Sequence, residues 1–331
     1  MESKYKAEVD VAVLCLFFNR PDKFGRVFEQ VKKARPSKLF LYQDGPRNED
    51  DLAKIQACRK IVVDIDWECE VHHQYCEKNQ GCDPSEYLSQ KWVFSVVDKC
   101  IILEDDDVPS VSFFLFCKEL LDRYENDERI TMISGVNYQE VTEYCPDDYF
   151  FTDDVAIWGW ATWKRVVDQW DEKYSFLDDS YSLMLLTNYL KSRLQRKNLI
   201  SSMKKHRISG VAYYETIMCA THFFSNGLAI VPKRNMINNI GVTSDSTHFN
   251  GGIKTMPRRL RKFFLMKRYE VQFPLKHPKY EIDNVRYNKD INKIFARNKP
   301  LLQFWRKICT FFLRLKYGDF ASIRRSIIKR F

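Results

Sequence analysis

The chain has 331 residues, of which 45% are hydrophobic and 29% are charged. A chain of this size and composition buries a large core as one elaborated domain, or as one domain with an appendage, and wholesale disorder is excluded. Its ten cysteines are scattered, and no apolar signal segment follows the polar start MESKYKAEVD. We therefore expect a reducing, cytoplasmic compartment. No stretch reaches the roughly 18 apolar residues that a membrane-spanning helix needs.

Charge is divided unevenly along the chain. The formal net charge is +9, but residues 253–331 contain 22 Lys/Arg against 5 Asp/Glu, which leaves 31 against 39 in residues 1–252. The body is therefore acidic, at −8, and the tail is basic, at +17. Such a tail favours an anionic partner, either a membrane surface or a nucleic acid. The acidic body gives no reason to expect nucleic acid.

The first part of the chain alternates strand and helix patterns. A continuous apolar run over residues 10–18 predicts a buried strand, which the turn signal Asn-Arg-Pro ends. Helical spacing over 22–34 and a second apolar run over 38–42 complete a βαβ unit. The alternation continues with a helix over 51–62, a strand over 67–73, a helix over 84–97 and a strand over 99–103. This pattern predicts an α/β fold with an open, mostly parallel sheet flanked by helices.

The later part of the chain is less regular. An aromatic, loop-rich stretch contains four tryptophans within residues 158–170. The predicted elements around it are a helix over 110–124, a strand over 130–134, a basic helix over 183–207, a helix over 211–224, a strand over 228–232 and a Gly/Ser/Thr/Asn-rich loop over 238–252.

Polar residues follow three of the predicted strands, after residues 18, 42 and 103. Ligands of open parallel sheets bind outside the carboxyl ends of the strands, so these residues are expected to line one crevice. The last group is Glu104, Asp105 and Asp106, whose mutual repulsion a divalent cation would relieve. Mg²⁺ and Mn²⁺ prefer oxygen ligands and need only one or two protein carboxylates when a substrate diphosphate supplies the rest. The alternative is an acidic turn that caps the next helix.

Several motifs, taken together, make the sequence recognisable. Residues 10–137 resemble the catalytic domain of metal-dependent GT-A glycosyltransferases, especially the N-acetylglucosaminyltransferase I group and the bacterial family 2-like proteins labelled hemolysin-activation-like. Later segments resemble the bacterial branch, so that the resemblance extends over roughly residues 10–250. The motifs that carry it are FNRPDKF (18–24), KLFLYQDGP (38–46), NQGCDPSEYLSQKWVF (79–94), ILEDDDVPSVSFFLFCKELLDRY (102–124), ISGVN (133–137), IWGWATWKRVVDQW (157–170), SNGLAIVPKRNMINNIG (225–241) and DSTH (245–248).

The resemblance implies a Rossmann-like GT-A domain over residues 1–252 and roles for individual residues. Residues 1–137 would form a donor half and 138–252 an acceptor half, followed by a basic helical extension over 253–331. Asp106 would be the direct ligand of Mn²⁺ or Mg²⁺. The donor would contact Arg20, Asp44, Glu104 and Asp105, and Asn79 to Cys82, including Gly81, would form a loop over it. The bacterial relatives usually have Cys where this chain has Asp107, which leaves open which carboxylate touches the metal.

An inverting transfer also needs a carboxylate base that removes the proton of the acceptor hydroxyl. The bacterial relatives have an Asp before the SNGL-like segment, where this chain has Glu215 in VAYYETIM. Glu215 is therefore the predicted base, with Asp153 and Asp154 in reserve, against the alternative of an exposed helix residue. His248 would complete the metal shell, although a lone histidine in such a loop is more often structural.

Aromatic and cysteine residues leave alternatives open. Trp158 and Trp160 would stack on sugar rings, or else pack in the core, and on an extended stretch they would share one face. A zinc site is a minor alternative, because Cys and His recur at short spacing in Cys69, His72, His73, Cys76 and Cys82.

Residues after Pro300 have apolar side chains at helical spacing among Lys and Arg, which predicts an amphipathic basic helix. Such a helix lies on an anionic membrane surface, or docks on the catalytic domain. The first option suits a lipid-linked acceptor and a peripheral position on the inner face of the plasma membrane.

The sequence and the resemblance together predict transfer of a sugar from a nucleotide-diphosphate donor, UDP-linked, to a glycan hydroxyl in bacterial surface polysaccharide synthesis. Two other functions compete with it. A sugar-nucleotide pyrophosphorylase would need a glycine-rich phosphate loop after the first strand, which FFNRPDKF lacks. A non-catalytic GT-A-like carbohydrate-binding or scaffold protein would keep the fold without the base.

Overall fold

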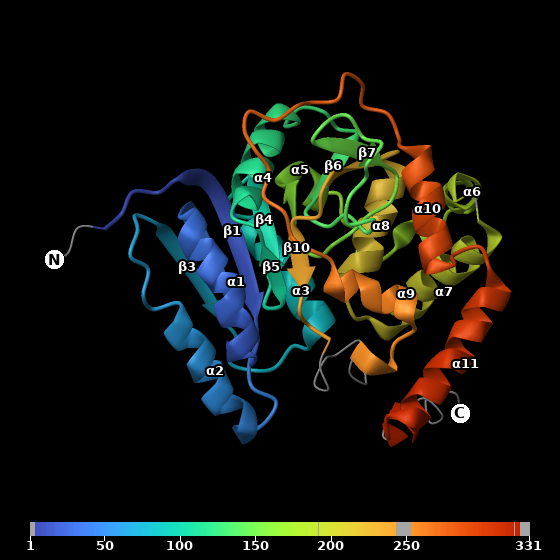
Figure 1. Ribbon diagram of the computed structural model, residues 1–331, viewed down its shortest axis with the longest axis horizontal. Helices are drawn as coiled ribbons and strands as arrows, with labels where there is room; N and C mark the ends of the chain where they lie inside the picture. Colours follow the sequence, from blue (N-terminus) through green and yellow to red (C-terminus); the bar gives the residue numbers. More distant parts are fainter. Residues whose placement is uncertain (1–3, 191, 243–252, 321, 325–331) are drawn as a thin grey trace.

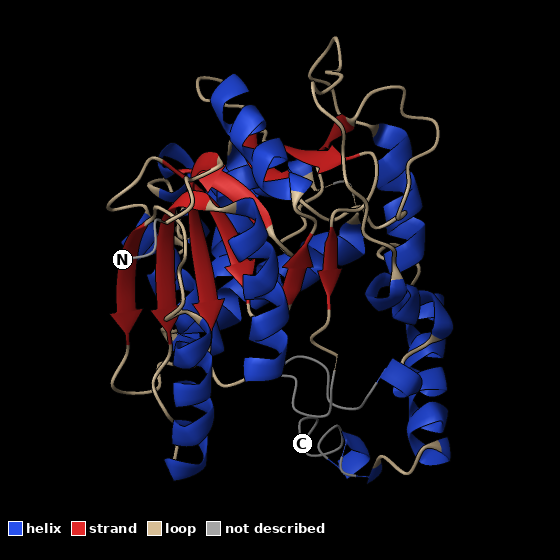
Figure 2. Ribbon diagram, turned by 60° about the vertical axis from the view of Figure 1, so that its left-hand side comes forward, coloured by secondary structure: helices blue, strands red, loops and turns tan. Residues whose placement is uncertain are grey.

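A computed structural model describes residues 4–190, 192–242, 253–320 and 322–324. Its main sheet has eight strands, with helices on both faces (Figures 1 and 2). These strands are β1 (Val9–Phe17), β2 (Pro36–Gln43), β3 (Glu70–Tyr75), β4 (Lys99–Glu104), β6 (Ile130–Ser134), β7 (Tyr149–Thr152), β8 (Trp160–Trp163) and β9 (Leu228–Pro232). Two short strands, β5 (Asp107–Pro109) and β10 (Ile237–Asn239), pair antiparallel in a second sheet.

The strand order of the main sheet is β3-β2-β1-β4-β8-β6-β9-β7. The four strands from β3 to β4 are parallel, and β6 pairs parallel with β9. Strands β8 and β7 run antiparallel to their neighbours. This arrangement confirms the predicted α/β class with a mostly parallel sheet and is consistent with a GT-A, Rossmann-like architecture.

The described helices begin and end close to the predicted boundaries in the first half and less so later. They are α1 (Pro21–Ala34), α2 (Glu49–Ile61), α3 (Cys82–Val93), α4 (Ser112–Arg123), α5 (Lys164–Val167), α6 (Ser180–Tyr189), α7 (Arg193–Ser209), α8 (Tyr214–Phe224), α9 (Arg258–Arg261), α10 (Val285–Phe295) and α11 (Pro300–Lys316).

The central strand β1 shows why an uninterrupted apolar run forms a strand here. Alternate residues of β1 enter two separate cores: Val13 and Cys15 pack on the side of α1 and α4, while Ala12 and Leu14 pack on the other. Both faces are covered, so both need apolar side chains. Helix α1 turns Phe24 and Val27 into the first of these cores.

Two predicted elements differ from the structure. The predicted helix over residues 183–207 is wrong as a single element, because Leu190 has an extended backbone and the Ser192 side chain caps a new helix by accepting a hydrogen bond from the Gln195 amide at 3.2 Å. Strand β3 begins three residues later than predicted, because Trp67 is fully buried and its indole donates to the Pro36 carbonyl at 2.8 Å.

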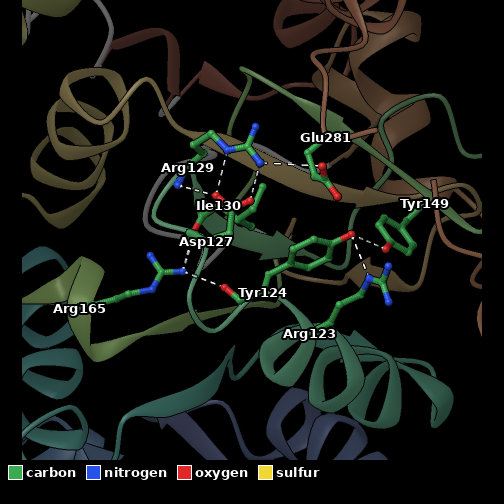
Figure 3. Close-up of polar contacts among 8 residues, drawn as sticks. All are labelled: Arg123, Tyr124, Asp127, Arg129, Ile130, Tyr149, Arg165 and Glu281. Carbon is green, nitrogen blue, oxygen red and sulfur yellow. Dashed lines mark hydrogen bonds and ion pairs between the residues drawn. The ribbon is translucent and has the colours of Figure 1, made fainter. Parts of the chain in front are cut away.

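The turn between α4 and β6 is held by side chains at the end of the sheet opposite to the carboxyl ends of β1 and β4. Figure 3 shows the Arg165 guanidinium beside this turn, where its Nη2 donates to the carbonyls of Tyr124, Asp127 and Ile130 at 3.2, 3.0 and 2.9 Å. These bonds satisfy the carbonyl of Tyr124, the C-cap of α4, and hold the turn that leads into β6.

The chain after residue 252 packs against the preceding sheet. Phe263 and Met266 share a core cluster with Val136. The Glu270 carboxylate accepts hydrogen bonds from the amides of Val111 and Ser112, at 3.1 and 2.7 Å, at the start of α4. The basic segment from residue 253 to α10 therefore contributes to the same packed unit as residues 1–252.

Candidate functional site

The main sheet has a topological switch point between β1 and β4. From β1 the chain proceeds to β2 and β3 on one side, and β4 returns to the other side of β1. Doubly wound folds bind ligands at this point, outside the carboxyl ends of the strands. Arg20 follows β1 there, and Asp105 and Asp106 follow β4.

Arg20 joins the two strand ends through the acidic residues. It precedes Pro21, the first residue of α1. Its Nε donates to Asp105 Oδ2 at 3.1 Å, its Nη2 contacts the other Asp105 oxygen, and its Nη1 lies 2.8 Å from Asp106 Oδ2. Burial raises the pKa of Asp105 to about 6, even though the charge of Arg20 lowers it. One guanidinium thus offsets only part of the negative charge at this strand end.

Asn239 holds the next two carboxylates from the second sheet. Its Nδ2 donates to Asp106 Oδ1 at 2.9 Å and to Asp107 Oδ1 at 3.0 Å. The other oxygen of Asp107 accepts a hydrogen bond from the Gly159 amide at 2.8 Å. Gly159 has φ +56°, and a Cβ there would come within 2.5 Å of Ile237, so this close approach requires glycine. Asp107 is therefore a structural anchor, and both oxygens of Asp106 are likewise engaged, one by Asn239 and the other by Arg20.

Residues 104–107 are four consecutive carboxylates, and carboxylate oxygens are the ligands that a hard divalent cation prefers. Burial, then the negative charges of Glu86 and Asp107, hold the pKa of Glu104 well above its usual range. A Cβ on Gly241 would lie 2.3 Å from Asp106 Oδ2, so a larger residue would press on this carboxylate. No group of three or more His, Cys, Asp or Glu is arranged to hold a metal among the described residues. A cation at this strand end would therefore have one or two protein carboxylates as ligands and would need a substrate to complete its shell.

Asp44 organises the predicted donor loop. Its Oδ1 accepts hydrogen bonds from the amides of Gly45 and Gln80, both at 2.8 Å. Its Oδ2 accepts from the side chain of Asn79 at 2.7 Å and from the Gly81 amide at 3.0 Å. A carboxylate offers about four lone-pair positions, and these four bonds use them. The structure thus brings Asp44, Asn79 and Gly81 together, and Asp44 positions the loop.

Glu215 lies exposed in the first turn of α8. Across from it, Glu86 of α3 is 5% exposed. Burial, then the charge of Glu215, hold the pKa of Glu86 well above its usual range. Sequence reasoning missed Glu86 because a helical Glu next to a strand-end motif carries no local signal of burial. It also missed Asn239, whose role depends on the pairing of β10 with β5.

The reserve candidates Asp153 and Asp154 are engaged by the C-terminal segment. Arg297 Nη1 lies 2.7 Å from Asp154 Oδ1, and Asn288 Nδ2 donates to Asp153 Oδ1 at 2.6 Å. The structure thus ties both reserve candidates to the C-terminal segment, and no sequence motif pointed to Arg297.

The two tryptophans predicted for sugar stacking do not share a face. Trp160 is 1% exposed and packs in the core beyond β8, so its ring cannot stack on a ligand and the core alternative holds for it. Trp158 packs half-buried against Tyr138 and Phe264, with ring centroids 6.0 and 5.0 Å apart. The positive φ of Gly159 between them breaks the extended geometry on which the prediction rested. The half-buried ring of Trp158 can still contact a sugar, whereas the buried ring of Trp160 cannot.

Two further candidates have different outcomes. His248, the predicted late metal ligand, lies outside the described residues. Of the zinc candidates, His72 contacts the Glu70 carboxylate at 2.8 Å and stacks on Phe40. The described Cys and His residues form no metal-binding group of three.

Comparisons with known proteins add little. No family model matches the chain, and no curated protein matches it. The crystal structure of an active-site mutant of LgtC aligns with 64% of this chain and 70% of that chain, at 6% identity and a TM-score of 0.30. A likeness at this TM-score carries no argument about donor, acceptor or reaction.

Proposed function

We propose that the chain is a metal-dependent, inverting glycosyltransferase that transfers a sugar from a nucleotide-diphosphate donor, UDP-linked, to a glycan hydroxyl. The observation that carries this proposal is the run Glu104 to Asp106 at the switch point of the sheet, held by Arg20 and Asn239. Nucleotide ligands of such sheets bind at this place, and the motif resemblance points to the same residues.

In this proposal the donor half supplies binding and orientation. The amides and side chains of the Asn79 to Gly81 loop, positioned by Asp44, cover the nucleotide. Arg20, whose three guanidinium nitrogens contact Asp105 and Asp106, lies near the donor nucleotide in this proposal. Asp106, with Glu104 and Asp105 around it, would hold Mn²⁺ or Mg²⁺, and the bound ion would supply Lewis-acid stabilisation of the departing diphosphate.

The acceptor half supplies the base. Glu215 removes the proton from the acceptor hydroxyl as that oxygen attacks the anomeric carbon from the face opposite the diphosphate. Burial and the charge of Glu215 raise the pKa of the neighbouring Glu86 carboxyl and so favour its protonated form.

Membrane association through α11 completes the proposal. Leu301, Phe304 and Trp305 are 83%, 64% and 60% exposed, although they lie on the apolar face of the helix. The polar side chains of Gln303 and Arg306 instead turn inward and donate to the Ala296 and Ile294 carbonyls, at 2.9 and 2.8 Å. An apolar face turned outward and flanked by Lys and Arg fits the headgroup region of an anionic bilayer.

No described helix is long and apolar enough to cross a bilayer. The contact that we propose is peripheral, on the inner face of the plasma membrane, and would bring the site to a lipid-linked acceptor of surface polysaccharide synthesis. Replacing Phe304 and Trp305 by Ser should release the protein from vesicles containing phosphatidylglycerol without lowering its thermal stability, because both side chains are exposed. Unchanged vesicle binding would contradict this role of α11.

The test of the transferase proposal is nucleotide release from a panel of nucleotide sugars, with Mn²⁺ or with EDTA. We expect slow hydrolysis of one donor that needs metal and that Asp106→Ala lowers roughly 1,000-fold. The matched control is Asp50→Ala, an exposed position in α2. If no nucleotide sugar is hydrolysed or bound, the proposal fails and the non-catalytic carbohydrate-binding or scaffold function takes its place.

A further inference from the structure

Helices α6 and α7 form a second surface with outward-facing apolar and basic residues. On α6, Tyr181, Met184 and Leu185 are exposed at helical spacing, so one side of this helix is apolar and faces outward. On α7, Ile208 is 86% exposed. These four apolar side chains and the cationic side chains of α7 together are called the α6–α7 face.

The cations of this face line a groove of about 590 Å³. Its walls combine the cationic side chains of α7 with Ile200, Ile208 and Thr187. The cations are Arg193, Arg196, Lys197, Lys204 and Lys205.

These charges lack local compensation. Helix α7 contains no Asp or Glu in its 17 residues. Within the described part of the chain, Arg207 of α7 forms an ion pair with Asp178, and no carboxylate pairs with Lys197, Lys204 or Lys205. Of the groove cations, Arg196 also donates to the Thr187 carbonyl at 3.0 Å. The groove therefore presents excess positive charge beside exposed apolar side chains.

We propose that the α6–α7 face is a second contact surface for an anionic lipid bilayer. Charge complementarity argues for an anionic partner, and the exposed apolar residues on the same two helices argue for a lipid surface rather than a soluble polyanion. Figure 1 places α6, α7 and α11 on the same side of the molecule, on the right, away from β3 and α2. The inference deepens the membrane contact proposed for α11 and does not depend on sugar transfer.

The experiment compares vesicle flotation of the full chain with phosphatidylcholine alone and with phosphatidylcholine containing phosphatidylglycerol. We expect Lys204→Gln with Lys205→Gln to weaken binding to the anionic vesicles by roughly five-fold for each charge removed. The matched control is Lys54→Gln with Lys60→Gln, two exposed lysines of α2, which should leave binding unchanged. Binding by the Lys204/Lys205 variant that equals the wild type would overturn the proposal.

A second variant distinguishes lipid from a soluble polyanion. Met184→Ser with Leu185→Ser should weaken binding to anionic vesicles but leave binding to dextran sulfate unchanged, because only a bilayer receives apolar side chains. Strong binding to dextran sulfate with no loss on vesicles in this variant would make the groove a polyanion site and overturn the inference. If only the variant with Phe304 and Trp305 replaced by Ser lost binding to anionic vesicles, the membrane contact of α11 would stand and that of the α6–α7 face would be refuted.

Discussion

Residues 1–137 and 138–252, the predicted donor and acceptor halves, hold their polar residues by different means. In the donor half, Arg20, Asp44 and Asp106 each follow a parallel strand, and the strand order alone brings them to one edge of the sheet. In the acceptor half, antiparallel strands intervene, and Asp154 is held by Arg297, 143 residues away in the sequence. Local sequence therefore locates the polar edge of the sheet, while the predicted acceptor half depends on long-range contacts.

Glu215 and Glu86 give the sharpest test of this difference, because one belongs to each half. Removing a general base lowers rates by roughly 100- to 10,000-fold, so Glu215→Gln should lower glycosyl transfer by about 1,000-fold while donor binding persists. Glu86→Gln should lower the rate less than Glu215→Gln does, since burial and the charge of Glu215 raise the pKa of Glu86 and favour its uncharged form, which glutamine resembles. Transfer rates and donor affinity of the two variants would be measured together.

The opposite ranking of these two variants would move the base to the donor half. Equal losses in both would mean that the pair acts as one unit sharing a proton.

His222 tests how far the acceptor half relies on buried polar contacts. Its Nδ1 lies 2.6 Å from Thr131 Oγ1 and its Nε2 lies 3.2 Å from the Asp153 carbonyl, and burial lowers its pKa to about 4. In the unfolded chain the His222 imidazole has an ordinary pKa near 6.5. As pH falls, it is therefore protonated in the unfolded chain before it is protonated in the folded protein. The free energy of unfolding should therefore decrease between about pH 6.5 and 4, by on the order of 3 kcal/mol at most from this residue.

The measurement is urea unfolding at a series of pH values, with His222→Gln as the comparison. The variant should be less stable at pH 7 and should lose less stability on acidification. If the free energy of unfolding depends on pH in the same way in the variant and the wild type, His222 is not a cause of the loss of stability at low pH.

Arg297 tests whether the C-terminal segment supports the acceptor half. Its ion pair with Asp154 is partly shielded from water, so Arg297→Gln should cost about 1–2 kcal/mol of unfolding free energy, between the values for exposed and buried pairs. A double-mutant cycle with Asp154→Asn would measure the coupling of the two side chains. Coupling near zero would mean that the segment contacts the acceptor half without stabilising it through this pair.

Much of the fold and part of the site follow from the sequence. The apolar run of β1, the helical spacing of α1 and the polar residues after β1 and β4 predict a doubly wound sheet and its binding edge. The single helix predicted over residues 183–207 is wrong, because the capping of α7 by Ser192 has no strong signal in that run of basic residues. The sugar-stacking prediction for Trp160 fails because one glycine turns the chain between two tryptophans.

The sequence by itself determined where charge must gather: parallel strands all end at one edge, so any polar residue that follows them is brought there. Only the tertiary structure decided what each carboxylate does. Asp107 is held by Gly159 and Asn239, Asp44 by the donor loop, and Glu86 is buried beside Glu215. The physical reason is that desolvation and hydrogen bonding, which set whether a carboxylate binds a ligand, accepts a proton or anchors the chain, come from neighbours far away in the sequence.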